Sequence, residues 1–224
     1  MKFKVNNWNK LQDSSTPKLL IIGCANSKSP HHGHVEVNYV NCDFGENILA
    51  TRNQRMVYYR ALLNNPNHDN YFTVPREGVN VAANYFQNTL NENYYQALNL
   101  YGSNYSPFYN EAIKALYREK IADHNLHLLI ISGLYGLLKY DDCINDYHLK
   151  INKGPQNWGN SILLGVENYI HQNNIDNDSV FYSLSNNYLE TLNPVHMDWT
   201  NLWRNYGGRG RQQASDLIEF LNNL

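Results

Sequence analysis

Short apolar runs alternate with longer amphipathic stretches along this chain. Residues 18–24, 126–132 and 179–184 read KLLIIGC, LHLLIIS and SVFYSL, and their apolar positions are mostly continuous rather than alternating. Continuous apolar residues are typical of strands that are covered on both faces, as in a parallel sheet. The pattern therefore predicts three buried parallel strands.

Between and after these runs, apolar residues recur at helical spacing. In residues 106–124, Ser106 is the expected N-cap and Pro107 occupies the first helical position. One-sided apolar stripes are formed by Ile113, Leu116, Tyr117 and Ile121 in this segment, by Ile162, Val166, Tyr169 and Ile170 in residues 160–172, and by Ala214, Leu217, Ile218 and Leu221 in residues 212–224. Such stripes predict helices that pack one face against a core.

Strands that alternate with helices of this length predict an α/β layered fold with a mainly parallel central sheet. The chain has no internal repeat, low-complexity tract or clear linker, so the expected organisation is a single domain over residues 1–224. Residues 40–105 follow the pattern least well. Residues 52–63 look helical, and short helices with breaks follow, so we interpret this stretch as a helical excursion.

Composition narrows the function classes. The formal net charge of the 224-residue chain is −2 and its pI is near 6.5, whereas proteins that coat nucleic acid are usually basic. Any nucleic-acid contact must therefore depend on a local patch. The three cysteines lack CxxC spacing, the first residues lack the apolar core of a signal peptide, and no apolar run approaches the ~20 residues that span a bilayer. We expect a cytoplasmic protein with no membrane partner.

Each predicted strand ends in a polar loop, and ligands of open parallel sheets bind outside the carboxyl ends of the strands. The first loop, residues 24–34, reads CANSKSPHHGH. Lys28 is a point charge with three donors and, together with Asn26, can hold an anion or the polar edge of a base. The alternative is turn chemistry, in which Asn and Ser side chains bond their own backbone and Lys28 is solvated.

The same loop contains three histidines and a cysteine. The HHxH spacing of His31, His32 and His34 is poor for a tetrahedral metal site, and no distant cysteine pair completes one. We therefore expect no metal, and interpret one of these histidines as a polar contact near a phosphate. Cys24 and Cys143 could both lie near the site, but a cysteine nucleophile needs a base and an electropositive niche, for which the sequence offers only nearby His and Lys residues.

The loop after the second strand, residues 132–149, reads SGLYGLLKYDDCINDYHL. Gly133 and Gly136 allow the backbone to turn tightly and approach a ligand, and Ser132 can contact a phosphate or a leaving group. The alternative is a tight loop that packs its leucines into the core. The glycines do not form a GxGxxG fingerprint, so we expect no dinucleotide cofactor.

This second loop also contains most of the candidate acidic groups. They are Asp141, Asp142 and Asp146, with His148 close by. Carboxylates near the carboxyl end of a strand can orient water or stabilise positive charge on a sugar in a transition state. The alternative is a solvated acidic turn. Asp146 is the sharper candidate, because it stands between the apolar residues Ile144 and Leu149.

CANSKSP and the block SGLYGLLKYDDCINDYHL, about 100 residues later, together resemble the YaaA-like superfamily. In that group a C-x-x-S-K-type loop follows the first strand, and an SGLYGLL block follows a central strand. The first block is also similar to an element of the glycosylase-like domain attached to archaeosine-type tRNA-guanine transglycosylases, a domain related in fold to uracil-DNA glycosylases. The resemblance covers residues 18–34 and 126–151, and the middle third of the chain does not match.

The resemblance implies a three-layer α/β fold near the uracil-DNA-glycosylase type and a nucleic-acid substrate. Relatives used in anti-phage defence remove modified bases. This implies a DNA N-glycosylase that flips a modified base out of double-stranded DNA, leaves an abasic site and needs no cofactor. Two alternatives remain open. One is a YaaA-type peroxide-stress protein that binds DNA without glycosylase activity, and the other is an N-glycosidase of free nucleosides or nucleotides.

Carried over by position, the resemblance implies a pocket from both loops. Its residues are Cys24, Asn26, Ser27, Lys28, Ser29, Pro30 and His31, facing Ser132, Gly133, Tyr135 and Gly136, with Asp141, Asp146 and Tyr147 on the second loop. His148 of the second loop is a further candidate for substrate contact. The water-activating GxDPY motif of true uracil-DNA glycosylases is missing, so the resemblance does not name the catalytic residue. From the chemistry, Asp146 is the expected carboxylate, and Lys28 and Asn26 are the expected donors to the departing base. Tyr135 or Tyr147 could supply the aromatic face against which a flipped base stacks.

A basic, glycine-rich segment precedes the C-terminal helical pattern. Arg204, Arg209 and Arg211 surround Gly208 there. A glycine-rich turn into a helix N-terminus offers backbone N–H groups and a favourable dipole to a phosphate, and arginines add bidentate contacts. We therefore expect this segment to bind the DNA backbone. The alternative is a loop whose arginines pair with surface carboxylates.

Overall fold

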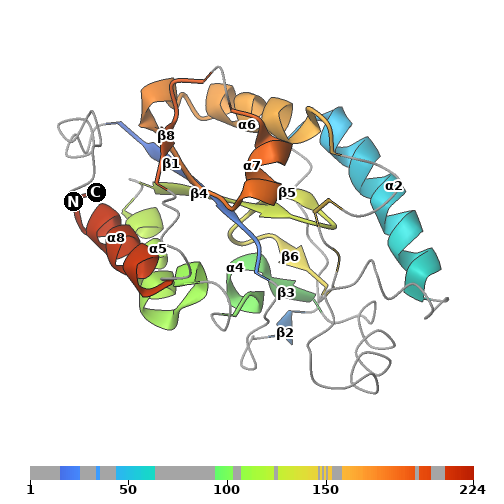
Figure 1. The fold of residues 1–224 in the computed structure, drawn as a ribbon, viewed down its shortest axis with the longest axis horizontal. Coiled ribbons are helices and arrows are strands. Elements are labelled where there is room, and N and C mark those ends of the chain that lie inside the picture. Colours follow the sequence, from blue (N-terminus) through green and yellow to red (C-terminus); the bar gives the residue numbers. More distant parts are fainter. Residues whose placement is uncertain are drawn as a thin grey trace.

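The computed structural model describes residues 16–25, 34–35, 44–63, 94–102, 107–123, 126–145, 147, 149, 151–152, 158–194, 197–202 and 210–224. These residues form a mixed α/β fold around a five-stranded central sheet (Figure 1). Its strands are β1 (Lys18–Gly23), β4 (Leu126–Ser132), β5 (Gly136–Lys139), β7 (Val180–Ser183) and β8 (Thr200–Asn201). A second, three-stranded sheet contains β2 (His34–Val35), β3 (Tyr94–Gln96) and β6 (Cys143–Ile144).

The helices connect these strands. They are α2 (Glu46–Leu63), α4 (Ala97–Leu100), α5 (Glu111–Ala122), α6 (Ser161–Gln172), α7 (Asn186–Leu192) and α8 (Gly210–Asn222), with 3₁₀ turns η2 (Pro107–Tyr109) and η3 (Asn177–Ser179). Of the stretch predicted as a helical excursion, the described parts contain α2, β3 and α4. Within the described ranges, no helix combines the length and apolar character needed to cross a membrane.

The central sheet is mostly parallel. Its strand order is β5-β4-β1-β7-β8, in which β5 alone pairs antiparallel with its neighbour. The three strands predicted from the apolar runs are confirmed as β1, β4 and β7, and they pair in parallel. The chain crosses from β1 to β4 on one side and later reaches β7 on the other. Its progress along the sheet therefore reverses at β1.

The loop predicted after β4 contains a further strand. Residues 133–135 form a turn, and β5 returns antiparallel to β4 with Gly136 opposite Ser132. The φ angle of Gly136 is +78°, in the left-handed region that glycine adopts without a steric penalty. The sequence predicts Gly133 and Gly136 as residues of a loop, but Gly136 begins β5. Leu134 belongs to the turn, and Leu137 and Leu138 belong to β5.

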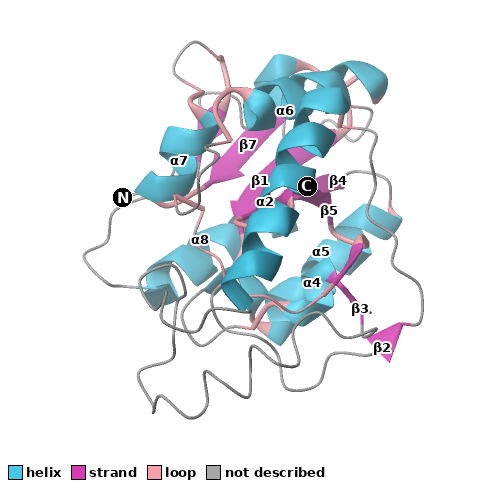
Figure 2. Cartoon of the chain, turned by 90° about the vertical axis from the view of Figure 1, so that its right-hand side faces the viewer, coloured by secondary structure: helices cyan, strands magenta, loops and turns pink. Residues whose placement is uncertain are grey.

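Side chains of β1 alternate between two cores. Leu20 and Ile22 pack with residues of α5 and α8, whereas Leu19 and Ile21 pack with residues of α2, α6 and α7. Accordingly, α5 and α8 lie on one side of the sheet and α6 and α7 on the other (Figures 1 and 2). Burial of each such side chain contributes about 1.5–3 kcal/mol, so the two cores hold helices against both faces.

The stripes predicted for the later helices face these cores. All four stripe residues of α6 are buried, and in α8 two are buried while two are partly buried against the same cluster. The helical pattern at 52–63 belongs to α2, which begins earlier, at Glu46. α2 packs along α6, and Gly165 allows their close approach, because a methyl group there would lie 3.0 Å from Ile48 Cγ1.

The start of α5 differs from the prediction of an N-cap at Ser106. Pro107 opens the 3₁₀ turn η2 instead, and α5 begins at Glu111. The N-cap is Asn110, whose side-chain oxygen accepts a hydrogen bond from the Ala112 amide at 2.8 Å. Asn is one of the strongest N-cap residues, so it can start the helix after the proline-initiated turn.

Candidate functional site

The two loops that carry the sequence motifs begin side by side. β1 and β4 are adjacent and parallel, with Gly23 opposite Ile131. The Cys24 amide donates to the Ile131 carbonyl oxygen at 2.8 Å. Cys24 and Ser132 therefore both lie at the carboxyl edge of the sheet. Cys24 follows β1, the strand from which the chain goes first to β4 on one side and later to β7 on the other. This is the edge where ligands bind in open parallel sheets.

Five side chains form a connected polar group at this edge, which we call the hydroxyl cluster. They are Cys24, Tyr101, Ser132, Tyr147 and Tyr188. Tyr147 is the central member. Its hydroxyl oxygen lies 2.5 Å from Ser132 Oγ and 3.0 Å from the Tyr101 hydroxyl, and its O–H donates to Cys24 Sγ at 3.4 Å. Tyr188 OH lies 3.1 Å from the same sulfur.

The donors of the cluster can be assigned from its centre outward. Because the single O–H of Tyr147 donates to Cys24, the contacts with Ser132 and Tyr101 require those hydroxyls to donate to Tyr147. Ser132 Oγ accepts in turn from the Tyr135 amide at 3.0 Å. The cluster is therefore a directed chain of hydrogen bonds that leads from the turn after β4 to Cys24.

Burial keeps the phenols of the cluster neutral. Ser132, Tyr101 and Tyr147 are at most 2% exposed, whereas Cys24 and Tyr188 are partly exposed. Desolvation raises the pKa of Tyr101, Tyr147 and Tyr188 well above the usual range, and the proximity of Cys24 adds to the shift. Each phenol consequently remains a hydrogen-bond donor at neutral pH.

The end of β1 is closely packed beneath the cluster. A methyl group on Gly23 would lie 2.9 Å from Cδ2 of the Tyr188 ring, so only glycine lets this ring lie against the strand. Tyr109 supports the same point from η2, because its hydroxyl donates to the Gly23 carbonyl oxygen at 2.8 Å. Tyr101 and Tyr109 also pack ring to ring, with centroids 5.2 Å apart.

The glycines of the second loop are closely approached by the chain itself. A methyl group on Gly133 would lie 2.0 Å from the Leu149 carbonyl oxygen, and one on Gly136 would lie 2.5 Å from the Trp158 ring. The leucines of this loop, Leu134, Leu137 and Leu138, are completely buried. The structure thus supports the packing alternative for these glycines, and Ser132 is the member of this turn that joins the hydroxyl cluster.

Two buried arginines of α2 hold this turn. Arg52 donates two hydrogen bonds, from Nε to the Tyr135 carbonyl oxygen at 2.8 Å and from Nη2 to the Leu137 carbonyl oxygen at 3.0 Å. Arg55 Nε donates to the Gly133 carbonyl oxygen at 2.9 Å. The Trp158 ring lies 5.3 Å from the Arg55 guanidinium. Burial lowers the pKa of Arg55 to about 10, so the side chain remains cationic at neutral pH.

Tyr135 lies behind Tyr147. The two rings pack edge to face with centroids 5.4 Å apart, and they are 3% and 2% exposed. The Tyr135 hydroxyl accepts from the Asn145 amide at 3.1 Å and donates to Asn145 Oδ1 at 3.3 Å. In this arrangement both tyrosines that the sequence suggested as stacking faces are parts of a packed wall.

Asp141 lies in different surroundings from the hydroxyl cluster. It is exposed on the turn between β5 and β6, where its charge helps to raise the pKa values of Tyr140, Cys143 and Tyr169. None of these three belongs to the cluster. The neighbouring Asp142 is buried and accepts from the Lys139 amide at 2.8 Å, which stabilises the turn.

Several predicted residues lie outside the described part of the chain. They are Asn26, Ser27, Lys28, Ser29, Pro30 and His31 of the first loop, Asp146 and His148 of the second, and Arg204, Gly208 and Arg209 near the C-terminus. Arg211 belongs to the first turn of α8, but the structure does not describe its side chain. Their roles stay predictions.

The sequence does not single out four residues of this region: Tyr101, Tyr188, Arg52 and Arg55. The tyrosines enter the cluster from a segment before η2 and from α7, and neither segment carries a motif. The available signal was the unusual number of tyrosines, 18 in the chain, but Tyr is equally common in cores. For the arginines, the signal is their spacing of three within a helix, which places both on one face.

Comparison with protein-family models gives no match for this chain, and no curated protein matches it.

Proposed function

We propose that the protein is an N-glycosidase that releases a modified base from double-stranded DNA in the cytoplasm, leaving an abasic site, as part of anti-phage defence. The observation that carries the proposal is the meeting of the two motif loops. Cys24 and Ser132, which begin these loops, share Tyr147 as a hydrogen-bond partner at the carboxyl edge of the sheet. The likeness of the same two loops to the YaaA-like superfamily supports glycosidic chemistry at this edge.

The hydroxyl cluster suits the departing base. Cleavage of an N-glycosidic bond builds positive charge on the sugar and negative charge on the base. The buried hydroxyls already bond one another and hold the partly exposed Cys24 thiol and Tyr188 hydroxyl at the edge of the sheet, so we assign these two groups to the base as its charge develops. Asp146, adjacent to Tyr147 in the sequence, is the carboxylate that we assign to the sugar, and Lys28 and Asn26 are the further donors that we assign to the base.

The proposal extends to the type of fold. Helices cover both faces of a mainly parallel sheet, and the progress of the chain reverses at β1. Both features support a three-layer α/β architecture of the uracil-DNA-glycosylase type. Because the GxDPY motif is missing, we assign the activation of water to Asp146 instead.

The direct test is the release of bases. The full chain is incubated with hypermodified phage DNA and with uracil-containing and alkylated duplexes. Released bases are identified by mass spectrometry, and abasic sites by alkaline strand cleavage. We expect release from at least one modified duplex. Tyr147→Phe removes the hydroxyl that joins both loops and should slow release by about 10²-fold, because Cys24 and Ser132 lose the shared bond that fixes their positions. Tyr169→Phe, which removes a hydroxyl from α6, is the matched control and should leave the rate unchanged.

Other outcomes would select a different function. If free nucleosides are cleaved while every DNA duplex stays intact, the protein is a small-molecule N-glycosidase. Binding to DNA with no released base, together with a peroxide-sensitive deletion phenotype, would indicate the YaaA-type stress protein. Intact strands and no free base across the whole panel would contradict the proposal.

A further inference from the structure

A hollow lies beside the first residues of β4, at the end of this strand that is remote from the hydroxyl cluster. It encloses about 150 Å³ between α5 and α6. Its apolar wall includes Ile121, Leu126 and Leu128. The start of β4 and Ser132 are separated by ~13–20 Å along the strand, so the hollow is distinct from the candidate site.

The hollow has a structural cause in the register of the sheet. β5 pairs with β4 only from Leu129 to Ser132, and its last residue, Lys139, lies opposite Leu129. The first residues of β4 therefore extend beyond the paired part of β5. α5 covers this end of the strand from one face, through Ile121, and α6 covers it from the other, through Tyr169.

Two polar side chains of the hollow are held in fixed protonation states. His127 Nδ1 lies 2.8 Å from the Tyr169 hydroxyl. Burial, with the charge of Asp141 nearby, raises the pKa of Tyr169 to about 12, so this hydroxyl keeps its proton. Burial and the Lys139 cation lower the pKa of His127, so the ring is neutral at neutral pH. Tyr169 therefore donates to Nδ1, and the hydrogen of the imidazole is on Nε2.

The cation of the hollow is Lys139, whose ammonium nitrogen lies 5.8 Å from the centre of the Tyr169 ring. The hollow therefore suits a ligand with one negative charge and a flat apolar body. The ammonium and the imidazole N–H can bind the charge, and the apolar wall can pack against the body. Asp141 and Asp142 both add negative charge near Tyr169, which disfavours ligands with more than one negative charge.

We propose that this hollow binds a small aromatic monocarboxylate. The ring packs against Ile121, Leu126 and Leu128, and the carboxylate accepts from Lys139 and from the imidazole N–H of His127. The proposal does not depend on glycosidase activity, and its test uses binding alone. Failure of one proposal therefore leaves the other standing.

The experiment follows ¹H–¹⁵N spectra of the full chain during titration with three probes: benzoate, its neutral analogue benzamide, and inorganic phosphate. Benzoate should shift the amide signals of residues 126–128 and 139–140 in a saturable manner, while those of Cys24 and Ser132 stay in place. Benzamide should bind about tenfold more weakly, because it lacks the charge that Lys139 and His127 recognise. Phosphate should cause no saturable shift.

Variants identify the cation that binds the probe. Lys139→Met should weaken benzoate binding about tenfold, whereas Lys139→Arg should retain most of it. Lys120→Met is the matched control, because Lys120 is a lysine of α5 that pairs with Glu119 and does not line the hollow. Circular dichroism confirms that each variant is folded. The proposal is overturned if benzoate shifts none of these signals, if benzamide binds equally well, or if Lys139→Met and Lys120→Met have equal effects.

Discussion

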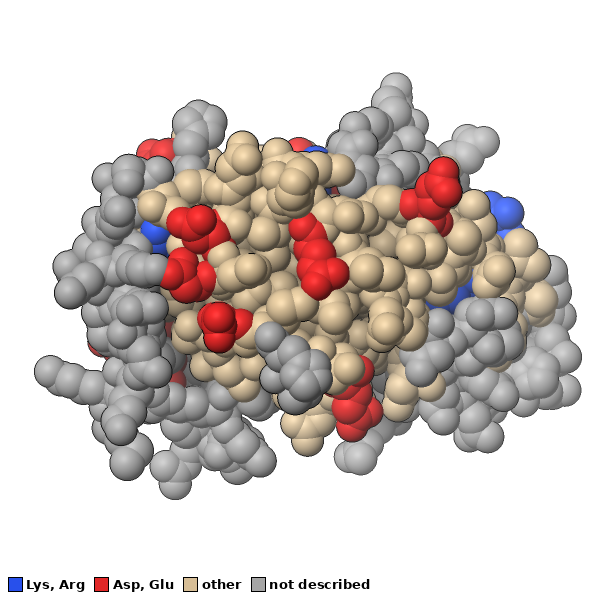
Figure 3. Space-filling model, turned by 90° about the horizontal axis from the view of Figure 1, so that it is seen from above, with Lys and Arg blue, Asp and Glu red and all other residues tan. Residues whose placement is uncertain are grey.

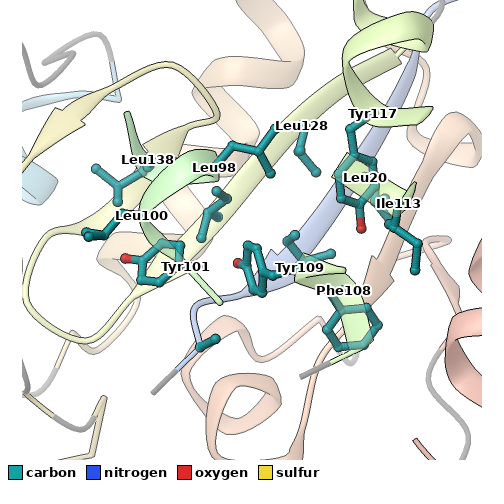
Figure 4. Packing of buried hydrophobic residues seen from close by; sticks show 14 of the residues in the cluster. Leu20, Leu98, Leu100, Tyr101, Phe108, Tyr109, Ile113, Tyr117, Leu128 and Leu138 are labelled. Atoms are coloured by element: carbon teal, nitrogen blue, oxygen red, sulfur yellow. The ribbon is translucent and has the colours of Figure 1, made fainter. Parts of the chain in front are cut away.

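At the scale of single residues, Tyr117 and Tyr109 make a matched pair. Both are buried tyrosines in the same core, and Figure 4 shows Tyr117 among Leu20, Ile113 and Leu128. The Tyr109 hydroxyl donates to the Gly23 carbonyl oxygen, whereas the Tyr117 hydroxyl has no hydrogen-bond partner among the described residues. An unsatisfied buried hydroxyl carries a desolvation cost, while the loss of one partner from a satisfied pair is destabilising.

We therefore expect opposite effects from the same substitution. Tyr117→Phe should leave the free energy of unfolding unchanged or raise it by up to about 1 kcal/mol, and Tyr109→Phe should lower it by about 1–2 kcal/mol. Urea denaturation of both variants measures the difference. Equal destabilisation by the two substitutions would mean that the Tyr117 hydroxyl is satisfied in solution.

The proposed chemistry depends on Asp146 and Lys28. If Asp146 stabilises charge on the sugar or orients water, Asp146→Asn should lower kcat by about 10²–10⁴-fold with a smaller effect on KM. Lys28→Ala should also reduce turnover while the fold stays intact. Single-turnover measurements of base release, with circular dichroism as the folding control, test both variants. Wild-type rates in both would place the site elsewhere in the molecule.

Individual site residues could be predicted only where the sequence around them was distinctive. Cys24 and Ser132 each follow an uninterrupted apolar run, so their position at the carboxyl edge of a sheet could be expected. Tyr101 and Tyr188 reach the same place by tertiary packing, and nothing local distinguishes them from core tyrosines. The roles of Gly133 and Gly136 could not be decided in advance, because close packing and close ligand approach both require glycine.

At the scale of helices and strands, the start of α5 can be tested directly. The Asn110 side chain accepts from the Ala112 amide, whereas Asn160, at the N-cap of α6, makes no side-chain capping bond. Asn110→Ala should therefore lower the free energy of unfolding by about 1 kcal/mol. Asn160→Ala is the control and should cost clearly less. Thermal unfolding of the two variants compares them, and equal losses would contradict the capping role of Asn110.

Elements with a single clear periodicity were predictable, whereas those defined by tertiary pairing were not. β1, β4 and β7 and the stripe of α6 follow from local patterns. β5 could not be predicted in this way, because its apolar residues follow closely on those of β4 and only a short turn separates the two strands. The two-residue strands β2 and β6 are defined by their pairing with β3 and are too short to show a period.

At the scale of the whole molecule, charge limits where DNA can bind. The helices above the sheet carry acidic side chains, Glu167 on α6 and Glu190 on α7. On the face seen from above, Asp and Glu are spread across the surface, while Lys and Arg show mainly toward its edges (Figure 3). A polyanion is repelled by such a face. This distribution favours an approach from the carboxyl edge of the sheet or from the basic segment before α8.

The last prediction concerns that basic segment. α8 begins at Gly210, and the glycine-rich residues come just before it in the sequence. Backbone amides and the helix dipole at a helix N-terminus favour a phosphate, and Arg209 and Arg211 would add charge-assisted contacts. Replacing both with Ala should weaken DNA binding across sequences. It should also flatten the dependence of log K on log salt by about 0.9 for each lost phosphate contact.

The control must remove the same charge from another place. Arg60 on α2 and Arg118 on α5 are exposed, and their double replacement by Ala changes the net charge by the same amount. Fluorescence anisotropy over a series of salt concentrations compares the two double variants. If only the loss of Arg209 and Arg211 flattens the slope, DNA contacts this segment. If both double variants flatten the salt dependence equally, the effect comes from overall charge. If the loss of Arg209 and Arg211 leaves DNA affinity unchanged, the segment is structural and DNA binds along another face.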